Sequence, residues 1–240
     1  MILHSLFILM FGGEMATGDK QNIIYEDNHI IVVEKPANIP SQSDKTGDLD
    51  MLTMIKQYLK QKYNKPGNVY LGLVHRLDRP VGGVMVFAKT SKAASRLSEQ
   101  VRNKSFKKKY IAIVNGKMEN KKGFFKDYLW KDAKKNMSFV VKEGKKNSKL
   151  AELDYEVIKY DKEQDLSIVK VNLHTGRHHQ IRVQFSSRMH AIYGDNKYHG
   201  RGAGTGICLF AYELTIVHPT KKEEMTFSKY PERKGMWQLI

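Results

Sequence analysis

The sequence predicts an α+β fold with a mixed, mainly antiparallel β-sheet and a few flanking helices. Strand-like segments follow one another between residues 107 and 219, and few helical patterns interrupt them. Several alternate in polarity, as in LSIVKVNL, where apolar residues flank Lys170 and Asn172. Strands in series with isolated helices are typical of α+β proteins, whereas a doubly wound parallel sheet needs a helix after almost every strand.

The first elements are two short strands in IIYEDNHIIVVEKPANIP (23–40), with a polar turn at Asp27–Asn28. Pro36 and Pro40 end the second strand, because proline lacks the backbone donor that a sheet requires. Further strands surround a charged cluster near residue 78. The later strands are KYIAIVNG (109–116), GFFKDYLW (123–130), ELDYEVIKYD (152–161), LSIVKVNLHTG (166–176) and ICLFAYELTIVHP (207–219).

Two helices precede the later strands, at residues 48–64 and 91–103, and Thr90 or Ser91 can cap the second. Each carries apolar residues at helical spacing, which predicts one buried stripe. The expected stripes are Leu52, Ile55 and Leu59 in the first helix, and Ala94, Leu97 and Val101 in the second. The segment RHHQIRVQFSSR (177–188) predicts a short helix that packs on the sheet.

The charge balance points to an anionic partner. The 240 residues include 41 Lys plus Arg against 25 Asp plus Glu, which gives a net charge of +16. Such a surplus attracts polyanions, of which nucleic acid is the commonest. Lysine runs interleaved with aromatic residues crowd into residues 103–149, an arrangement that favours phosphate contacts on one surface. An anionic membrane is the alternative, but no long amphipathic basic helix supports it.

The single cysteine, Cys208, excludes an internal disulfide and a cysteine-rich zinc site, and it is typical of the reducing cytosol. No apolar run reaches membrane-spanning length. Residues 1–21 are expected to be a dispensable or flexible leader, because their apolar stretch lacks the preceding Lys or Arg of an export signal. Translation from Met15 would remove most of it. Residues 22–240 are expected to form one catalytic domain.

Four histidines (His174, His178, His179 and His190) raise the question of a metal site. Thr175–Gly176 interrupts the helix that would place the first two on one face. No Asp, Glu or Cys at ligand spacing supports them either. The sequence therefore predicts no metal site.

The segment LVHRLDRPVGGVMVFAKT (73–90) has a cluster of charged residues between two apolar runs. Asp78 is its only acid, and it stands among His75, Arg76 and Arg79. A neighbouring cation holds a carboxylate ionised even where water is scarce. An ion pair that merely closes a turn is the simpler interpretation.

Two further features favour a functional site. The Gly82–Gly83 pair allows another backbone to approach closely. A second arginine-rich segment, with Arg177 and Arg182, offers another cation for the same pocket.

The motifs together resemble the RluA family of pseudouridine synthases. HRLDRPVGGVMVFAK resembles the family's HRLD signature, and the likeness extends in order and spacing from about Ile23 to Phe227. IVVEKPANIP is similar to the family's Lys-Pro segment and KKKYIAIVNG to its Lys-x-Tyr strand. LHTGRHHQIRVQFSSRMHAIYGDNKY is similar to its TGRxHQIR…GD..Y block, and LFAYELTIVHP to its closing strand.

The resemblance implies an enzyme that isomerises specific uridines in structured ribosomal or transfer RNA, without cofactor or metal. It implies a sheet in two halves with a central RNA-binding cleft. No separate N-terminal RNA-binding domain of the kind some relatives carry is expected, because the Lys-Pro segment begins so early. It implies catalytic roles for Asp78, Tyr110 and Arg182. The implied RNA contacts are His75, Arg76, Arg177, His179, Gln180, Lys107, Lys108 and Lys109.

These residue types suit the chemistry. The target base must leave its stack, and Tyr110 supplies a ring face and a hydroxyl for the flipped nucleotide. Asp78 must be ionised to attack the ribose or the pyrimidine, or to take a ribose proton, and Arg182 would keep it charged and oriented. The detached uracil must rotate before it rejoins through C5, so a closed pocket is required.

The family commonly has Thr-Ser-Gly where this chain has Val81–Gly82–Gly83, and a His where it has Gln184. The rival interpretation is a non-catalytic RNA-binding protein on the same fold, and a general DNA-binding protein is a third. The combination of Asp78, Tyr110 and Arg182 favours the enzyme. We expect a cytoplasmic monomer with RNA as its partner, no membrane association and no obligate protein partner.

Overall fold

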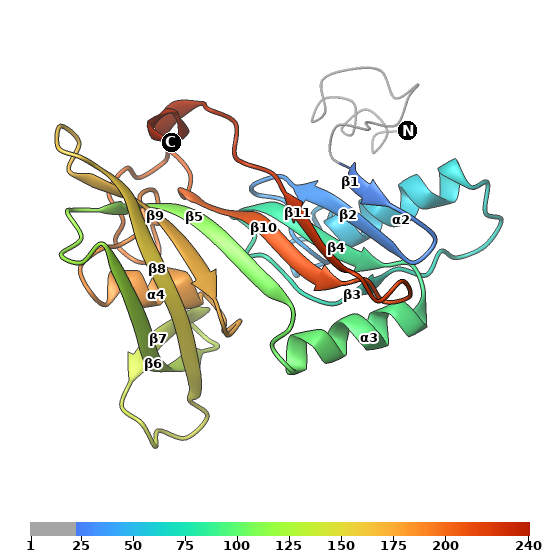
Figure 1. The fold of residues 1–240 in the computed structure, drawn as a ribbon, viewed down its shortest axis with the longest axis horizontal. Helices are drawn as coiled ribbons and strands as arrows, with labels where there is room; N and C mark the ends of the chain where they lie inside the picture. The colour runs from blue at the N-terminus through green and yellow to red at the C-terminus, as the bar shows by residue number, and fades with distance from the viewer. Residues whose placement is uncertain (1–22) are drawn as a thin grey trace.

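A computed structural model describes residues 23–240 (Figure 1). The expected leader, residues 1–21, and the alternative start at Met15 lie outside these residues, so both stay predictions. The elements are β1 (Ile23–Glu26), β2 (Ile30–Lys35), α2 (Met51–Lys62), β3 (Gly72–Leu73), β4 (Gly82–Ala88), α3 (Ser91–Arg102), β5 (Lys107–Asn115), β6 (Lys122–Asp132), β7 (Met137–Val141), β8 (Lys149–Asp161), β9 (Leu166–Leu173), α4 (Gln180–Ser186), β10 (Leu209–Val217), β11 (Glu224–Ser228) and the 3₁₀ helix η2 (Gly235–Leu239).

All the strands belong to one 11-stranded sheet, in the order β1-β2-β4-β10-β5-β9-β8-β6-β7. Outside this order, β11 pairs with β10, and β3 pairs with β4. Every pairing is antiparallel except that of β10 with β4. The predicted mixed, mainly antiparallel α+β fold is confirmed.

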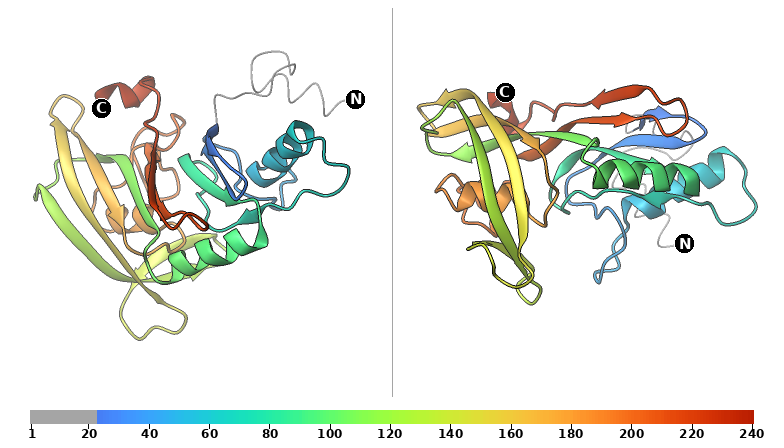
Figure 2. Two further views of the ribbon diagram at one scale, coloured as in Figure 1. Left: turned by 45° about the vertical axis from the view of Figure 1, so that its right-hand side comes forward. Right: turned by 60° about the horizontal axis from the view of Figure 1, so that its bottom comes forward.

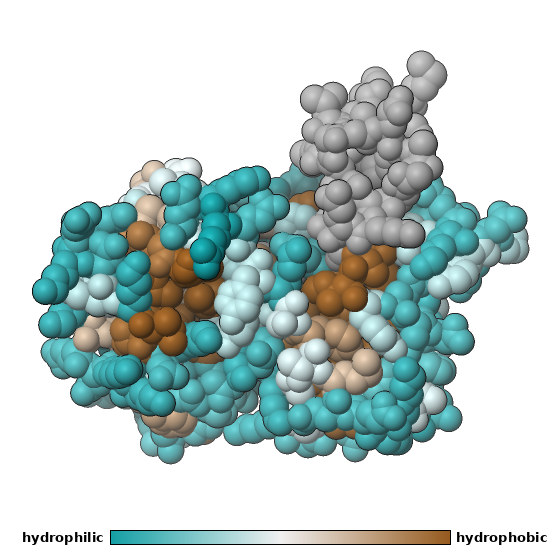
Figure 3. All heavy atoms as spheres, turned by 45° about the horizontal axis from the view of Figure 1, so that its top comes forward, coloured by the Kyte–Doolittle hydropathy of each residue, from teal (hydrophilic) through white to brown (hydrophobic). Residues whose placement is uncertain are grey.

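The sheet has two halves, which β10 joins (Figure 1). The first half consists of β1 to β4, and the second consists of β5 to β9. Figure 2 shows the curved strands of the second half standing apart from the helices α2 and α3. The face seen in Figure 3 is mostly hydrophilic with apolar patches, as the high content of charged residues leads us to expect.

The joint between the halves depends on Gly83. β10 pairs with β4 at only two positions, Phe210 with Gly82 and Ala211 with Gly83. Gly83 has φ +133°, and a Cβ there would lie 2.3 Å from the carbonyl oxygen of Ala211. Only glycine accommodates both that backbone conformation and that approach. The close backbone approach predicted for the glycine pair is therefore present.

We expect Gly83→Ala to lower the free energy of unfolding by about 3 kcal/mol or more, because the new methyl group must push β10 away from β4. Urea denaturation measures this. Gly67→Ala is the matched control, because no atom lies within 4 Å of its Cβ position. Equal stability of the two variants would show that the joint tolerates widening.

The helices form where expected, but their buried stripes differ by one residue. In α2 the buried residues are Met51, Ile55 and Leu59, and Leu52 lies half-buried beside them. The difference arises because spacings of i, i+3 and i+4 all lie on one helix face, so two neighbouring stripes fit the same sequence.

In α3 the same displacement occurs. Thr90 caps the helix by accepting a hydrogen bond from the Ala93 backbone N–H. Ala93 and Leu97 are buried, whereas Val101 is 36% exposed at the end of the helix. α3 therefore covers the sheet with its first two turns.

Opposite faces of the sheet carry different clusters, and this arrangement positions the site. One face packs α2 and α4 against residues such as Tyr110 and Val171. The other face carries η2 over Ile111 and Phe210. Tyr110 and Ile111 are adjacent in β5, so their side chains mark the two faces. Within residues 23–240, no helix has the length and apolar character needed to cross a bilayer.

Candidate active site

Asp78 and Arg182 lie next to each other, although 104 positions separate them in the chain. Asp78 lies in the loop between β3 and β4, in the first half, and its side chain is 29% exposed. Arg182 projects from α4, in the second half, and its Nη1 donates to Asp78 Oδ2 at 3.3 Å. The two halves of the sheet thus each supply one member of the pair.

Asp195 fixes the orientation of that arginine. Arg182 Nε and Nη2 donate to the two carboxylate oxygens of Asp195, each at 2.7 Å. The Asp195 side chain is fully buried, and the ring of Tyr198 lies 5.2 Å from the guanidinium carbon. Burial alone would lower the pKa of Arg182, but the hydrogen bonds and charge of Asp195, with that of Asp78, raise it. Arg182 is therefore a fixed cation aimed at Asp78.

Tyr110 comes from the middle of β5 and is 6% exposed. Burial, and then the negative charge of Asp78, raise the pKa of its phenol well above the usual range. The phenol therefore stays neutral, and Tyr110 offers an apolar ring whose hydroxyl is within the electrostatic influence of Asp78.

His179 also faces Asp78. The side chain is buried, with Nε2 3.7 Å from Asp78 Oδ2 and Nδ1 2.9 Å from the hydroxyl of Tyr198. Its ring stacks on His178 at 3.7 Å. Burial, and then the charge of Arg182, lower the pKa of His179 to about 2, so the imidazole is neutral.

Gln180 and Arg177 hold the turn before α4. Gln180 is 3% exposed, and its Oε1 accepts hydrogen bonds from the Thr175 hydroxyl and the Arg177 backbone N–H. Arg177 is exposed, and its Nε donates to the carbonyl of Leu150. The RNA contacts expected of these two residues and of His179 stay predictions.

His75 and Arg76 differ in orientation. His75 Nε2 accepts a hydrogen bond from the backbone N–H of Val86, and its ring lies 4.9 Å from that of Phe106. Burial lowers the pKa of His75 to about 3, with the charge of Lys108 contributing, so it remains neutral. Arg76 is exposed on the same loop as Asp78. His75 therefore anchors the loop, and Arg76 is exposed to solvent, so the RNA contact expected of it stays a prediction.

The three consecutive lysines are not equivalent. Lys107 and Lys109 form ion pairs with Glu224 and Glu213 on the face of the sheet opposite Tyr110. Lys108 lies on the same face as Tyr110, two residues away along the strand. It is half-buried and has no ion-pair partner among residues 23–240. Burial lowers its pKa.

Lys35 supports the Asp78 loop and was not identified as a site residue from the sequence. It is fully buried, and its ammonium donates to the carbonyl oxygens of Pro36, Ile39 and Arg79. Burial lowers its pKa to about 7, against the opposing effect of the Asp78 charge. The only signal in the sequence was its place in the Lys-Pro segment.

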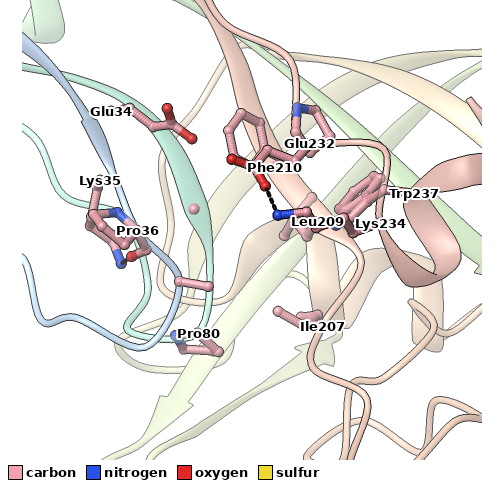
Figure 4. Close-up of a pocket in the computed structure, with 13 residues that line it drawn as sticks. Glu34, Lys35, Pro36, Pro80, Ile207, Leu209, Phe210, Glu232, Lys234 and Trp237 are labelled. Atoms are coloured by element: carbon pink, nitrogen blue, oxygen red, sulfur yellow. Dashed lines mark hydrogen bonds and ion pairs between the residues drawn. The ribbon is translucent and has the colours of Figure 1, made fainter. Parts of the chain in front are cut away.

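A hollow of about 320 Å³ is lined by residues of β2, β4, β10 and the C-terminal segment (Figure 4). Pro80 and Lys35 form part of its wall, together with Phe210 and Trp237. Because Phe210 and Trp237 pack on the face of the sheet opposite Tyr110, this hollow is separate from the Asp78–Arg182 site.

The other two histidines that were considered as metal ligands lie away from this site. His174 Nε2 pairs with Asp154, and His190 Nδ1 bonds to the carbonyl of Asn115. The four histidines considered as metal ligands therefore serve three separate local networks.

Comparison with known proteins identifies relatives of this chain. A family model described as RNA pseudouridylate synthase matches residues 29–187. An uncharacterized RNA pseudouridine synthase of Aquifex aeolicus is 36% identical over 220 residues, 86% of this chain and 68% of that protein. An uncharacterized RNA pseudouridine synthase of Bacillus subtilis is 32% identical over 206 residues, and the match covers 84% of this chain but 66% of the relative.

Two further relatives extend the comparison. The dual-specificity RNA pseudouridine synthase RluA of Haemophilus influenzae is 32% identical over 217 residues, which cover 86% of this chain and 91% of that enzyme. The solved structure of human RNA pseudouridylate synthase domain containing 4 aligns with a TM-score of 0.73 and 23% identity over 88% of this chain and 89% of that chain. The second likeness concerns the fold alone.

Proposed function

The chain belongs to the RNA pseudouridylate synthase family, and on that premise we propose that Asp78 is the residue that acts on a flipped-out uridine. Members of this family are isomerases that act on uridines in RNA, and this chain is an RNA pseudouridine synthase. The observation that supports the role of Asp78 is its 3.3 Å contact with Arg182, which connects the two halves of the sheet.

In the proposed reaction the target uridine leaves its stack, and the ring of Tyr110 packs against it. Asp78, which Arg182 orients, acts on the ribose or the pyrimidine as the N1–C1′ bond breaks. The uracil then turns so that C5 bonds to C1′, the C5 hydrogen leaves as a proton, and N1 takes up a proton from solvent, so the product is an isomer of the substrate. Arg76 lies on the exposed side of the same loop and contacts the RNA around the vacated position.

We propose structured ribosomal or transfer RNA as the substrate. The relatives support this choice, since one is named a dual-specificity RNA pseudouridine synthase and another a ribosomal large subunit pseudouridine synthase. We further propose that residues 22–240 act as one catalytic unit, as a cytoplasmic monomer without an obligate protein partner.

The direct test incubates the purified protein with ribosomal and transfer RNA transcripts that carry tritium at C5 of uridine. Release of tritium to water measures turnover. Mapping of pseudouridines in cells with and without the gene then identifies the position. If neither kind of RNA releases tritium and no position changes in the cells, the non-catalytic RNA-binding interpretation is favoured.

The three lysines of β5 give a prediction with internal controls. We expect Lys108→Gln to weaken RNA binding several-fold and to reduce the slope of log affinity against log salt by about 1, because Lys108 lacks a competing carboxylate. Lys107→Gln and Lys109→Gln should have smaller effects, since each lysine already neutralises a glutamate. Fluorescence anisotropy at several salt concentrations measures this. Equal losses for all three would place the RNA backbone along both faces of the sheet.

A further inference from the structure

The hydroxyl of Tyr198 has a defined hydrogen-bond direction. The backbone N–H of Ser138 donates to it at 2.7 Å, and its other contact is His179 Nδ1 at 2.9 Å. A phenol has one hydrogen to donate. The Ser138 N–H can only donate, and if Nδ1–H were also a donor, the phenol oxygen would accept twice and its own hydrogen would have no acceptor among residues 23–240. We therefore assign the tyrosine as the donor to His179 Nδ1.

That direction sets the tautomer of His179. A neutral imidazole carries one hydrogen, so a ring whose Nδ1 accepts must carry the hydrogen on Nε2. Nε2 is the atom that faces Asp78 Oδ2, at 3.7 Å. This separation is longer than a full hydrogen bond, and hydrogen bonds in active sites often shorten when substrate binds.

The ring of His179 is held firmly in this orientation. Its backbone is left-handed, with φ 53°, and it immediately precedes α4. The stacked ring of His178 is itself anchored, because Ser138 Oγ lies 2.9 Å from His178 Nδ1 and donates to the His178 carbonyl. Ser138 in β7 therefore fixes both histidines, one directly and one through Tyr198.

Both protein contacts of the Asp78 carboxylate fall on the same oxygen. Arg182 Nη1 and His179 Nε2 approach Oδ2, and Oδ1 has no hydrogen-bond or ion-pair partner within the part of the chain that the structure describes. A carboxylate held at one oxygen presents the other in a fixed direction. Oδ1 is thus the atom that is free to meet the nucleotide.

We propose that His179 is a positioning residue for Asp78, and that Tyr198 selects the imidazole tautomer whose Nε2–H holds Oδ2 and directs Oδ1 at the uridine. This inference rests on the proposed role of Asp78. It assigns His179 to the carboxylate and not to RNA contact, and it adds Tyr198 to the residues on which turnover depends.

Kinetics of three variants test it. Tyr198→Phe should lower kcat about tenfold or more and leave KM within about twofold of the wild type. The variant keeps the aromatic ring but loses the hydroxyl, so His179 is no longer restricted to one tautomer. His179→Leu should lower kcat about 100-fold, as expected when a preorganised N–H donor is lost. His179→Gln keeps an N–H donor at the position of Nε2 and should recover about tenfold of that loss.

Tyr155→Phe is the matched control, because Tyr155 is also buried, at 6% exposure, and packs against α4 without contacting His179. It should retain wild-type kcat. A wild-type kcat for Tyr198→Phe, an equal loss in His179→Gln and His179→Leu, or a rise in KM with unchanged kcat would each overturn the proposal. A rise in KM with unchanged kcat would indicate that His179 contacts RNA and does not position Asp78.

A measurement independent of activity separates this inference from the proposed function. ¹⁵N NMR of histidine-labelled wild-type protein should show His179 in the Nε2–H tautomer, and Tyr198→Phe should show a mixture. The Nδ1–H tautomer in the wild type would overturn the inference even if the enzyme is active. Absence of turnover with the Nε2–H tautomer present would instead count against the role of Asp78.

Discussion

Replacing Asp78 with Asn should abolish turnover while RNA affinity stays close to that of the wild type. The amide has nearly the same shape as the carboxylate but lacks its negative charge, so it can neither attack the nucleotide nor take a ribose proton. RNA affinity should persist because the cations that attract phosphates are unchanged. Tritium release from C5-labelled transcripts and anisotropy on the same RNA measure the two quantities.

The variant should also remain folded. Within residues 23–240, Asp78 has one hydrogen bond to a side chain, and Arg182 keeps its two bonds to Asp195, so the free energy of unfolding should change by less than about 1 kcal/mol. Asp154→Asn, at an exposed carboxylate that pairs with His174, is the matched control and should turn over normally. Normal turnover in Asp78→Asn would remove Asp78 from the mechanism.

Replacing Arg182 with Met should remove turnover and also destabilise the protein by about 3–5 kcal/mol. The large cost arises because Asp195 would be left as a buried charge without its partner. Urea denaturation and tritium release measure the two effects.

A double variant separates the two roles of Arg182. Arg182→Met combined with Asp195→Leu removes both buried charges, so much of the stability should return, whereas turnover should not. If the double variant regained turnover together with stability, the guanidinium would not be needed to orient Asp78. The single observation supporting the proposed site would then have a purely structural explanation.

The fold could be predicted because its main signals are local. Polarity alternation identified the long strands, and the glycine pair marked the joint where β4 meets β10. β7 and β11 were not predicted, because each is a strand of only 5 residues at the edge or extension of the sheet, too short for its pattern to stand out. Ile55, Leu59 and Leu97 are buried as predicted, and only the first member of each helix stripe differs by one position, because spacings of i+3 and i+4 both lie on one helix face.

The candidate site was only partly predictable. The family resemblance placed Asp78, Tyr110 and Arg182 together, which no local pattern could do across 104 positions. Asp195 and Tyr198 lay in a segment with a recognised pattern, but their roles depend on which buried group each one faces. A sequence gives the polarity of a side chain and not its direction.

The three lysines at the start of β5 show the same limit, because the sequence does not give the direction of their side chains. Three lysines in a row look equivalent in sequence, yet alternation along β5 sends Lys108 to one face and its neighbours to the other. His179 and Gln180 likewise have polar side chains that bond within the protein. Their positions in a motif indicated importance, and the structure supplies the contacts by which each contributes.

The seam at Gly83 has a consequence for how the enzyme loses its activity. Asp78 belongs to one side of the joint and Arg182 to the other, so a slight widening there would lengthen the contact between them. The apolar cluster spans both sides, and a small displacement would leave most of it buried. Chemical competence would then disappear before the bulk of the molecule melts. The turnover rate therefore reports on how closely the two halves of the sheet are held together.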